Sequence, residues 1–208
     1  MPRISPQEFC ARPLRVHSLL AGVPLHDVWA VELPAVREAV TLQEFRRRMK
    51  RKDSTERLSL PTRALIRLRF LVGQMFGWDS EPSETPEELF AERLTANDRA
   101  RSTVLAGTRE GIFRGTREGI FRVVYSFENE MLLELINRTV HAAALSALAE
   151  TPKGYRFYFA IYVRKRGWIT PVYMAAIDPF RRWVIYPAIL RQIESDWTEA
   201  FGMDAAKR

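Results

Sequence analysis

The sequence predicts an α+β domain in which an antiparallel sheet packs against a long C-terminal helix. Two patterns support this class. Between 155 and 164, large apolar side chains occupy the odd positions and therefore share one face of a strand. Between 173 and 197, large apolar residues recur at steps of three and four, which places them on one side of a helix. This helix needs an apolar partner, and the strand face is the nearest one in the chain.

The first half of the chain predicts a strand and then helices. Residues 25–34 alternate as a strand does, with Trp29 on one side and Val28 on the other. A capping box, Thr41 to Glu44, opens a helix that runs to about residue 50. A proline start and a glycine stop then bound a second helix at about 59–77.

The middle of the chain predicts an antiparallel meander. From 102 to 164 the pattern is strand-like, with turn signals at 108–111, 128–129 and 151–154, so four or five strands are expected. An acidic connector at 79–100, in which a short helix starts near 85, separates this meander from the helices.

The meander contains a tandem duplication, because the octapeptide GTREGIFR occupies 107–114 and again 115–122. An insertion of even length preserves which side chains face the core downstream, so the fold can accept it. The turn could form on either copy, and the sequence leaves open which copy lies in the sheet. We interpret the repeat as a duplication without a role of its own; an evolved binding loop is the alternative.

Charge is unevenly distributed. Ten basic residues lie between 46 and 69 against Asp53 and Glu56, and seven acids follow between 79 and 98 against Arg93. The two blocks could face each other as solvated surfaces, or the basic block could bind anionic lipid or nucleic acid. A basic patch alone supplies only non-specific attraction, which is weak and screened by salt, so no specific nucleic-acid partner is expected.

Composition narrows the class further. The 208 residues, 47% of them hydrophobic, fit a single domain spanning 1–208 with its core at about 13–201. No apolar run is long enough to span a bilayer, and the first twenty residues do not read as a secretory leader, so a cytoplasmic location is expected. The single cysteine, Cys10, cannot form an internal disulfide or a metal cluster.

No catalytic motif emerges from the residues. None of the three histidines is paired at metal-ligand spacing, so no metal site is expected. His141 could act as an acid or base in a cavity, or it could be a hydrogen-bonded structural histidine. Asp178 is expected to cap the second half of the C-terminal helix, where Arg181 and Arg182 could contact an anionic head group. The Tyr186-Pro187 step is expected to kink that helix.

Five segments carry a resemblance to a known family: RVHSL, HDVWAVELP, FLVGQMFGWD, NRTVH and, most specifically, YMAAIDPFRRWVIYPAILRQI. Over about 13–197 the chain resembles the bacterial family named domain of unknown function 2867. The resemblance implies a helix-grip fold with START-like or polyketide-cyclase-like relatives, which enclose an apolar cavity between a curved sheet and the last helix. It implies no established activity. Without a G-x-G-x-x-G segment, no dinucleotide cofactor is expected.

The expected function is therefore binding of an apolar or amphipathic small molecule between the sheet and the C-terminal helix. An enzyme of the cyclase or hydrolase type using the same cavity is the alternative, and a weak binder of anionic surfaces is the third reading. No catalytic residue and no cofactor is assigned. The residues expected to contact the ligand are Trp29, Phe121, His141, Phe157, Phe159, Tyr173, Ile177, Phe180, Arg181 and Tyr186.

Overall fold

The computed structural model describes residues 4–50, 89–110, 121–136, 140–165, 175, 178–179 and 181–201. Its strands are β1 (Leu25–Pro34), β2 (Arg109–Glu110), β3 (Phe121–Ser126), β4 (Glu130–Ile136), β5 (Val140–Thr151) and β6 (Gly154–Lys165). Its helices are α1 (Pro6–Cys10), α2 (Arg15–Leu19), α3 (Leu42–Lys50), the 3-10 helix η2 (Phe90–Arg93), α5 (Ala96–Arg101), the π-helix η3 (Arg181–Ile185) and α7 (Tyr186–Ala200).

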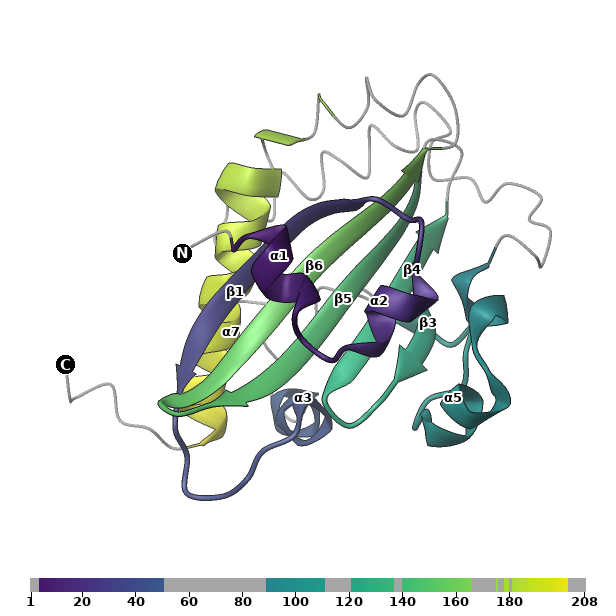
Figure 1. The fold of residues 1–208 in the computed structure, drawn as a ribbon. Coiled ribbons are helices and arrows are strands. Elements are labelled where there is room, and N and C mark those ends of the chain that lie inside the picture. Colours follow the sequence, from purple (N-terminus) through teal and green to yellow (C-terminus); the bar gives the residue numbers. More distant parts are fainter. Residues whose placement is uncertain are drawn as a thin grey trace.

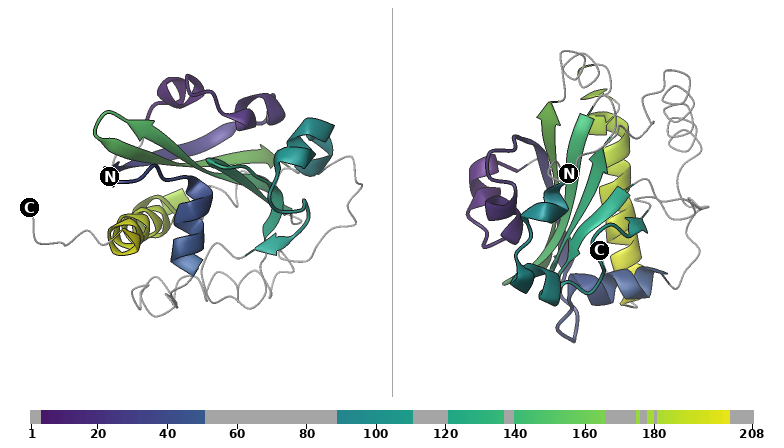
Figure 2. Two further views of the ribbon diagram at one scale, coloured as in Figure 1. Left: turned by 90° about the horizontal axis from the view of Figure 1, so that it is seen from below. Right: turned by 90° about the vertical axis from the view of Figure 1, so that its right-hand side faces the viewer.

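The strands form one antiparallel sheet in the order β1-β6-β5-β4-β3-β2. Helices lie on both faces of this sheet (Figures 1 and 2). α3 and α7 cover one face, here called the α7 face, and α1 and α2 cover the opposite face, here called the outer face. The predicted α+β class, a curved sheet with a C-terminal helix, is confirmed.

The first predicted strand is confirmed, because β1 has the predicted boundaries, 25–34. Its alternation also holds: Trp29 joins the core of the α7 face and Val28 joins the core of the outer face. α3 begins as predicted, since the amide of Glu44 donates to Oγ1 of Thr41 at 3.2 Å. These short-range signals sufficed because each depends on neighbouring residues only.

The core of the α7 face is built as the sequence predicts. Phe157 and Phe159 of β6 lie in it together with Tyr186, Leu190 and Trp197 of α7, all of them buried. The helix is not continuous α-helix, because a π-turn, η3, precedes Tyr186. Trp183 in that π-turn is 78% exposed and is therefore not part of the apolar stripe.

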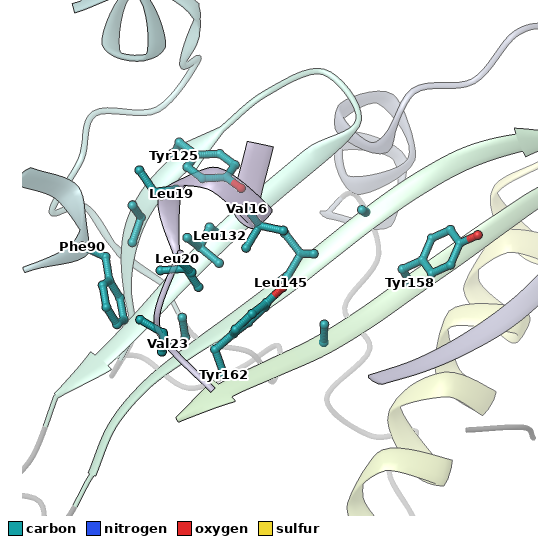
Figure 3. Close-up of a cluster of buried hydrophobic side chains, with 14 of the residues drawn as sticks. Val16, Leu19, Leu20, Val23, Phe90, Tyr125, Leu132, Leu145, Tyr158 and Tyr162 are labelled. Carbon is teal, nitrogen blue, oxygen red and sulfur yellow. The ribbon is translucent and has the colours of Figure 1, made fainter. Parts of the chain in front are cut away.

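The outer face is a second core, which the sequence analysis did not foresee. Tyr158 and Tyr162 of β6 lie on the face opposite Phe157 and Phe159, and they are 0% and 5% exposed. α1 covers Tyr158, since the ring of Phe9 lies 6.0 Å from it between centroids. α2 and the turn after it lie over the strands further along, as Figure 3 shows for Val16 and Leu20. The apolar side chains of the two short N-terminal helices supply this cover.

A buried carboxylate anchors the N-terminal cover to the sheet. Glu130, at the start of β4, is 6% exposed and accepts hydrogen bonds from the backbone amides of Arg15 and Val16, both at 2.9 Å. The hydroxyl of Tyr125 donates to the same carboxylate. Burial first, and then the charge of Glu130, raise the pKa of Tyr125 well above its ordinary value, so the phenol stays a donor. α2 therefore begins on a fixed negative charge.

The described part of the acidic connector packs on the sheet. Phe90 of η2 is fully buried in the outer core, and α5 starts with a capping box between Thr95 and Asp98. Asp98 also receives the Arg15 guanidinium at 2.7 Å, and this hydrogen bond lowers the pKa of Asp98 far below its ordinary value. The ion pair ties the N-terminal segment to the chain that precedes β2.

Both copies of the duplicated octapeptide contribute to the sheet. Arg109 and Glu110 of the first copy form β2, and they pair with Arg122 and Phe121 of the second copy, which open β3. Residues 111–120 lie outside the described part of the chain, as do the predicted helix at 59–77 and most of the basic block.

The β2–β3 register predicts the effect of removing one copy. Deleting 113–120 gives the same sequence as deleting either octapeptide, and it leaves only Gly111 and Ile112 between the paired residues Glu110 and Phe121. A Gly-X pair suits a two-residue type II′ hairpin. We expect the 200-residue protein, shortened by that octapeptide, to be equally stable or more stable by about 1 kcal/mol, measured by urea denaturation. A deletion protein that fails to fold would show that both copies are needed.

The Glu130 anchor predicts a second stability effect. Glu130→Gln removes the charge from the buried acceptor and should lower the free energy of unfolding by about 2 kcal/mol. Thermal unfolding by circular dichroism measures it. Glu128→Gln, at an exposed position two residues earlier, is the matched control and should leave the melting temperature unchanged. Equal melting temperatures for the two variants would contradict the role given to Glu130.

Candidate functional site

Charged residues from opposite ends of the chain meet where β1 begins and the C-terminal helix starts. His26 and Asp27 come from the first residues of β1, while Asp178, Arg181 and Arg182 precede α7. His26 Nε2 lies 3.0 Å from Asp178 Oδ1 and 3.5 Å from Asp27 Oδ2. We call these five residues the polar cluster.

Two arginines bridge the carboxylates of the polar cluster. The Arg181 Nη2 atom lies 2.6 Å from Asp178 and 3.4 Å from Asp27. The Arg182 Nη2 atom lies 3.0 Å from Asp178 and 3.7 Å from Asp27. Since the Asp27 side chain is 0% exposed, the guanidinium groups supply the positive charge that a buried carboxylate requires. Leaving His26 aside, the charges of the two guanidinium groups balance those of the two carboxylates.

The cluster shifts the pKa of half-buried Asp178. Burial alone would raise the pKa of Asp178, but the hydrogen bond with His26 and the charges of Arg181 and Arg182 together lower that pKa below its ordinary value of 3.8. Asp178 is therefore ionised at neutral pH. Its described contacts are with side chains, so it acts as a clamp between β1 and the helix start; the capping role expected from the sequence stays a prediction.

Aromatic side chains form a wall directly beside the polar cluster. The ring of Tyr186 lies 5.8 Å from Trp29 and 5.6 Å from Phe159, measured between ring centroids. The guanidinium carbon of Arg181 lies 5.6 Å from the centroid of Tyr186, a cation–π contact that joins wall to cluster. Burial chiefly raises the pKa of Tyr186, so its phenol is neutral.

One polar atom of this wall is unsatisfied. The indole N–H of Trp29 is buried and has no hydrogen-bond acceptor within the described residues. Trp197 of α7 differs, because its Nε1 donates to the carbonyl of Pro34 at 3.1 Å. A buried donor without an acceptor is costly, so this atom is a point where a ligand could compensate.

The donor set of the cluster is a poor fit to a metal ion. The ligand atoms of His26, Asp27 and Asp178 lie within 4.8 Å of one another, which is close enough to hold a cation. Both carboxylates are, however, already engaged by Arg181 and Arg182. A divalent cation would have to displace two guanidinium groups, which electrostatics disfavours.

The structure brings together four of the residues expected to contact a ligand: Trp29, Phe159, Arg181 and Tyr186. Phe157 lies on the same α7 face further along β6, and half-buried Phe121 packs against the same core from the start of β3. Tyr173, Ile177 and Phe180 lie outside the described residues.

His141 lies on the outer face, apart from the aromatic wall. Its Nε2 is 2.7 Å from Oε1 of Glu134, which also accepts the backbone amide of Phe90 at 2.8 Å. The Phe90 ring stacks on His141 with centroids 4.1 Å apart, and both members of the His–Glu pair are 1% exposed. This arrangement anchors η2 to β4 and β5 beneath a closed surface.

His26 and Asp27 are site residues that were not predicted from the sequence. A signal was present, because two polar residues directly precede the apolar run 28–31 of this strand, and a buried aspartate needs a cation. Nothing local could show that its partners lie some 150 residues away, at Arg181 and Arg182, as only the folded sheet brings them together.

Two other surface features lie away from the cluster. A pocket of about 660 Å³ opens at the far end of α7, lined by Ala35, Val36, Arg37, Glu38, Arg48, Ala200 and Phe201. Arg48, in the described end of the basic block, is paired with Glu44 at 2.9 Å and lies over the ring of Phe201.

Among the described helices, none is long and apolar enough to cross a bilayer.

Comparison with known proteins yields one match. A family model described as "Protein of unknown function (DUF2867)" matches residues 19–188. That span contains β1, the meander and all five residues of the polar cluster. No curated protein and no solved structure matches the chain.

The polar cluster predicts a pH-dependent stability effect. The folded-state pKa of Asp178 is depressed, so its contribution to stability is present above the unfolded pKa and is lost as the pH falls through the folded pKa. Asp178→Asn should lower the free energy of unfolding by about 2 kcal/mol at neutral pH, and the deficit should shrink below about pH 4.

Urea denaturation across this pH range measures the deficit. Glu38→Gln, which changes a carboxylate that is 81% exposed, is the matched control and should show little effect at any pH. A deficit for Asp178→Asn that stays constant with pH would mean that the carboxylate charge is not what stabilises the clamp.

Proposed function

The chain belongs to the DUF2867 family, and on that premise we propose that it binds a small amphipathic molecule where the start of α7 meets β1. The observation that carries the proposal is the aromatic wall of Trp29, Phe159 and Tyr186, which holds an unsatisfied indole N–H beside a part-buried charged cluster. Apolar surfaces with a few convergent polar groups are the usual composition of small-molecule sites.

The contacts divide the site into two regions. The ring faces of the wall offer apolar area to a hydrocarbon or aromatic moiety. Arg181 links this wall to the polar cluster, so a molecule lying along Tyr186 would have its other end near charged groups. The family resemblance points to the same side of the sheet, since helix-grip relatives are expected to hold apolar molecules between the sheet and the last helix.

Binding is favoured over catalysis by the placement of His141. An acid–base role for this residue would need access to the aromatic wall, and its partner Glu134 and the stacked Phe90 hold it on the outer face instead. In the polar cluster, His26 contacts Asp178 and the carboxylates are paired with arginines, an arrangement suited to a rigid, charge-balanced boundary.

The proposal is tested first on protein isolated from its own host. Native mass spectrometry should show a non-covalent adduct of a few hundred daltons that is lost on gentle activation. The adduct, extracted with organic solvent, should partition as an amphipathic molecule.

A dye titration locates the site. Nile red, a neutral probe that fluoresces in apolar surroundings, should bind the ligand-free protein, and Phe159→Leu should weaken its binding about fivefold. Phe9→Leu is the matched control, because Phe9 is an equally buried phenylalanine of the outer core. Equal dye affinity for the two variants, or a bare protein that binds no dye, would contradict the proposal.

A further inference from the structure

We propose that the ligand presents an uncharged hydrogen-bond acceptor, such as a ketone, ester or amide carbonyl, to the indole N–H of Trp29. This inference rests on the proposed function and adds the chemical class of the ligand's polar end. It comes from two independent features, namely the hydrogen-bonding state of the wall and the charge balance of the polar cluster.

The first feature is the missing acceptor at Trp29. The residue is 9% exposed, its Nε1 atom is buried, and within the described chain no group accepts from it. Tryptophan is a donor only, so the atom that completes the site must be an acceptor. The backbone carbonyls of β1 and β6 do not serve as this acceptor. Around Trp29 and Phe159, which lie opposite each other, the two strands pair with each other.

The second feature argues against an anionic head group, which the sequence had suggested for Arg181 and Arg182. Each guanidinium lies within 3.7 Å of carboxylate oxygens of both Asp27 and Asp178. A ligand carboxylate placed here would meet two like charges and would have to compete for cations that are already engaged. The arginines therefore neutralise the protein's own acids.

A cationic head group is disfavoured by the same balance. The two carboxylates already have two guanidinium partners, so an added ammonium group would bring an excess positive charge into a part-buried cluster. An ammonium group also has no lone pair to offer, so it would leave the indole N–H of Trp29 unsatisfied. A neutral acceptor is the head group that satisfies Trp29 without disturbing the cluster.

The test uses three probes with the same number of carbon atoms: methyl octyl ketone, decanoate and decylammonium. Each is titrated into the full-length, ligand-free protein, labelled with nitrogen-15. The chain has five tryptophans, so up to five indole N–H signals report on separate positions. We expect the ketone to bind about tenfold more tightly than either charged probe and to move the Trp29 signal downfield.

Internal controls are built into the same spectrum. The Trp197 indole already donates to Pro34, and Trp183 is 78% exposed, so both signals should stay in place. Trp29→Phe identifies the Trp29 signal and should weaken ketone binding about three- to tenfold, whereas Trp183→Phe should leave it unchanged. If Trp29→Phe does not fold, sequential assignment of the parent protein identifies the signal instead.

The outcomes separate the two proposals. Tighter binding of decanoate, or ketone binding that leaves the Trp29 signal unmoved, would overturn the neutral-acceptor inference while leaving a small-molecule site in place. Failure of all three probes to bind, together with failure of Nile red, would overturn the site itself. A Trp29 signal that moves with the ketone alone would support both.

Discussion

Burial of both faces of the sheet is the constraint on which the rest of the structure depends. Each central strand has to supply an apolar surface to α7 on one side and to the N-terminal helices on the other, so alternate residues of β6, such as Phe159 and Tyr158, serve different cores. Polar groups on these strands cannot reach water and need partners from the covering segments. Glu130 finds the amides that start α2, and Glu134 finds the amide of Phe90. The segments that cover the outer face are thus selected by hydrogen bonds as well as by apolar area.

The strands and the main helix could be predicted from the sequence because their signals are local. β1 and the alternation of β6 follow from neighbouring residues, and α3 from a capping box four residues long. The outer cover could not be predicted in this way. Its helices are five residues each, too short for a 3.6-residue period to appear, and the tyrosines beneath them are as common on wet faces as in cores. The family resemblance is confirmed, because the family model matches residues 19–188, whereas the START-like relatives that it implied stay a prediction.

The candidate site shows the same division between local and long-range information. Trp29, Phe159 and Tyr186 were identifiable as large residues on faces that meet, but the pairing of Asp27 with Arg181 depends on β1 lying at the edge of the sheet beside the start of α7. Buried charge also explains the balance of the cluster, since an aspartate with no exposed surface requires cations from whichever element passes nearest. His141 could not be placed from the sequence for the same reason. Its place on the outer face depends on the pairing of β5 with β6, in which His141 lies opposite Arg164.

The π-turn η3 has a consequence for how this protein can vary. A π-turn holds about one residue more than an α-helical turn, and each residue in an α-helix advances the side chains by about 100°. Removing one residue from Arg181–Ile185 would therefore rotate the residues before α7, Asp178 among them, by about 100° against the buried stripe of Tyr186, Leu190 and Trp197. The extra residue sets the angle between the segment that contacts Asp27 of β1 and the helix that packs on the sheet, and it leaves Trp183 exposed to solvent. The loops of this fold can accept insertions and deletions. The same changes within η3 would separate the polar contacts from the buried helix face.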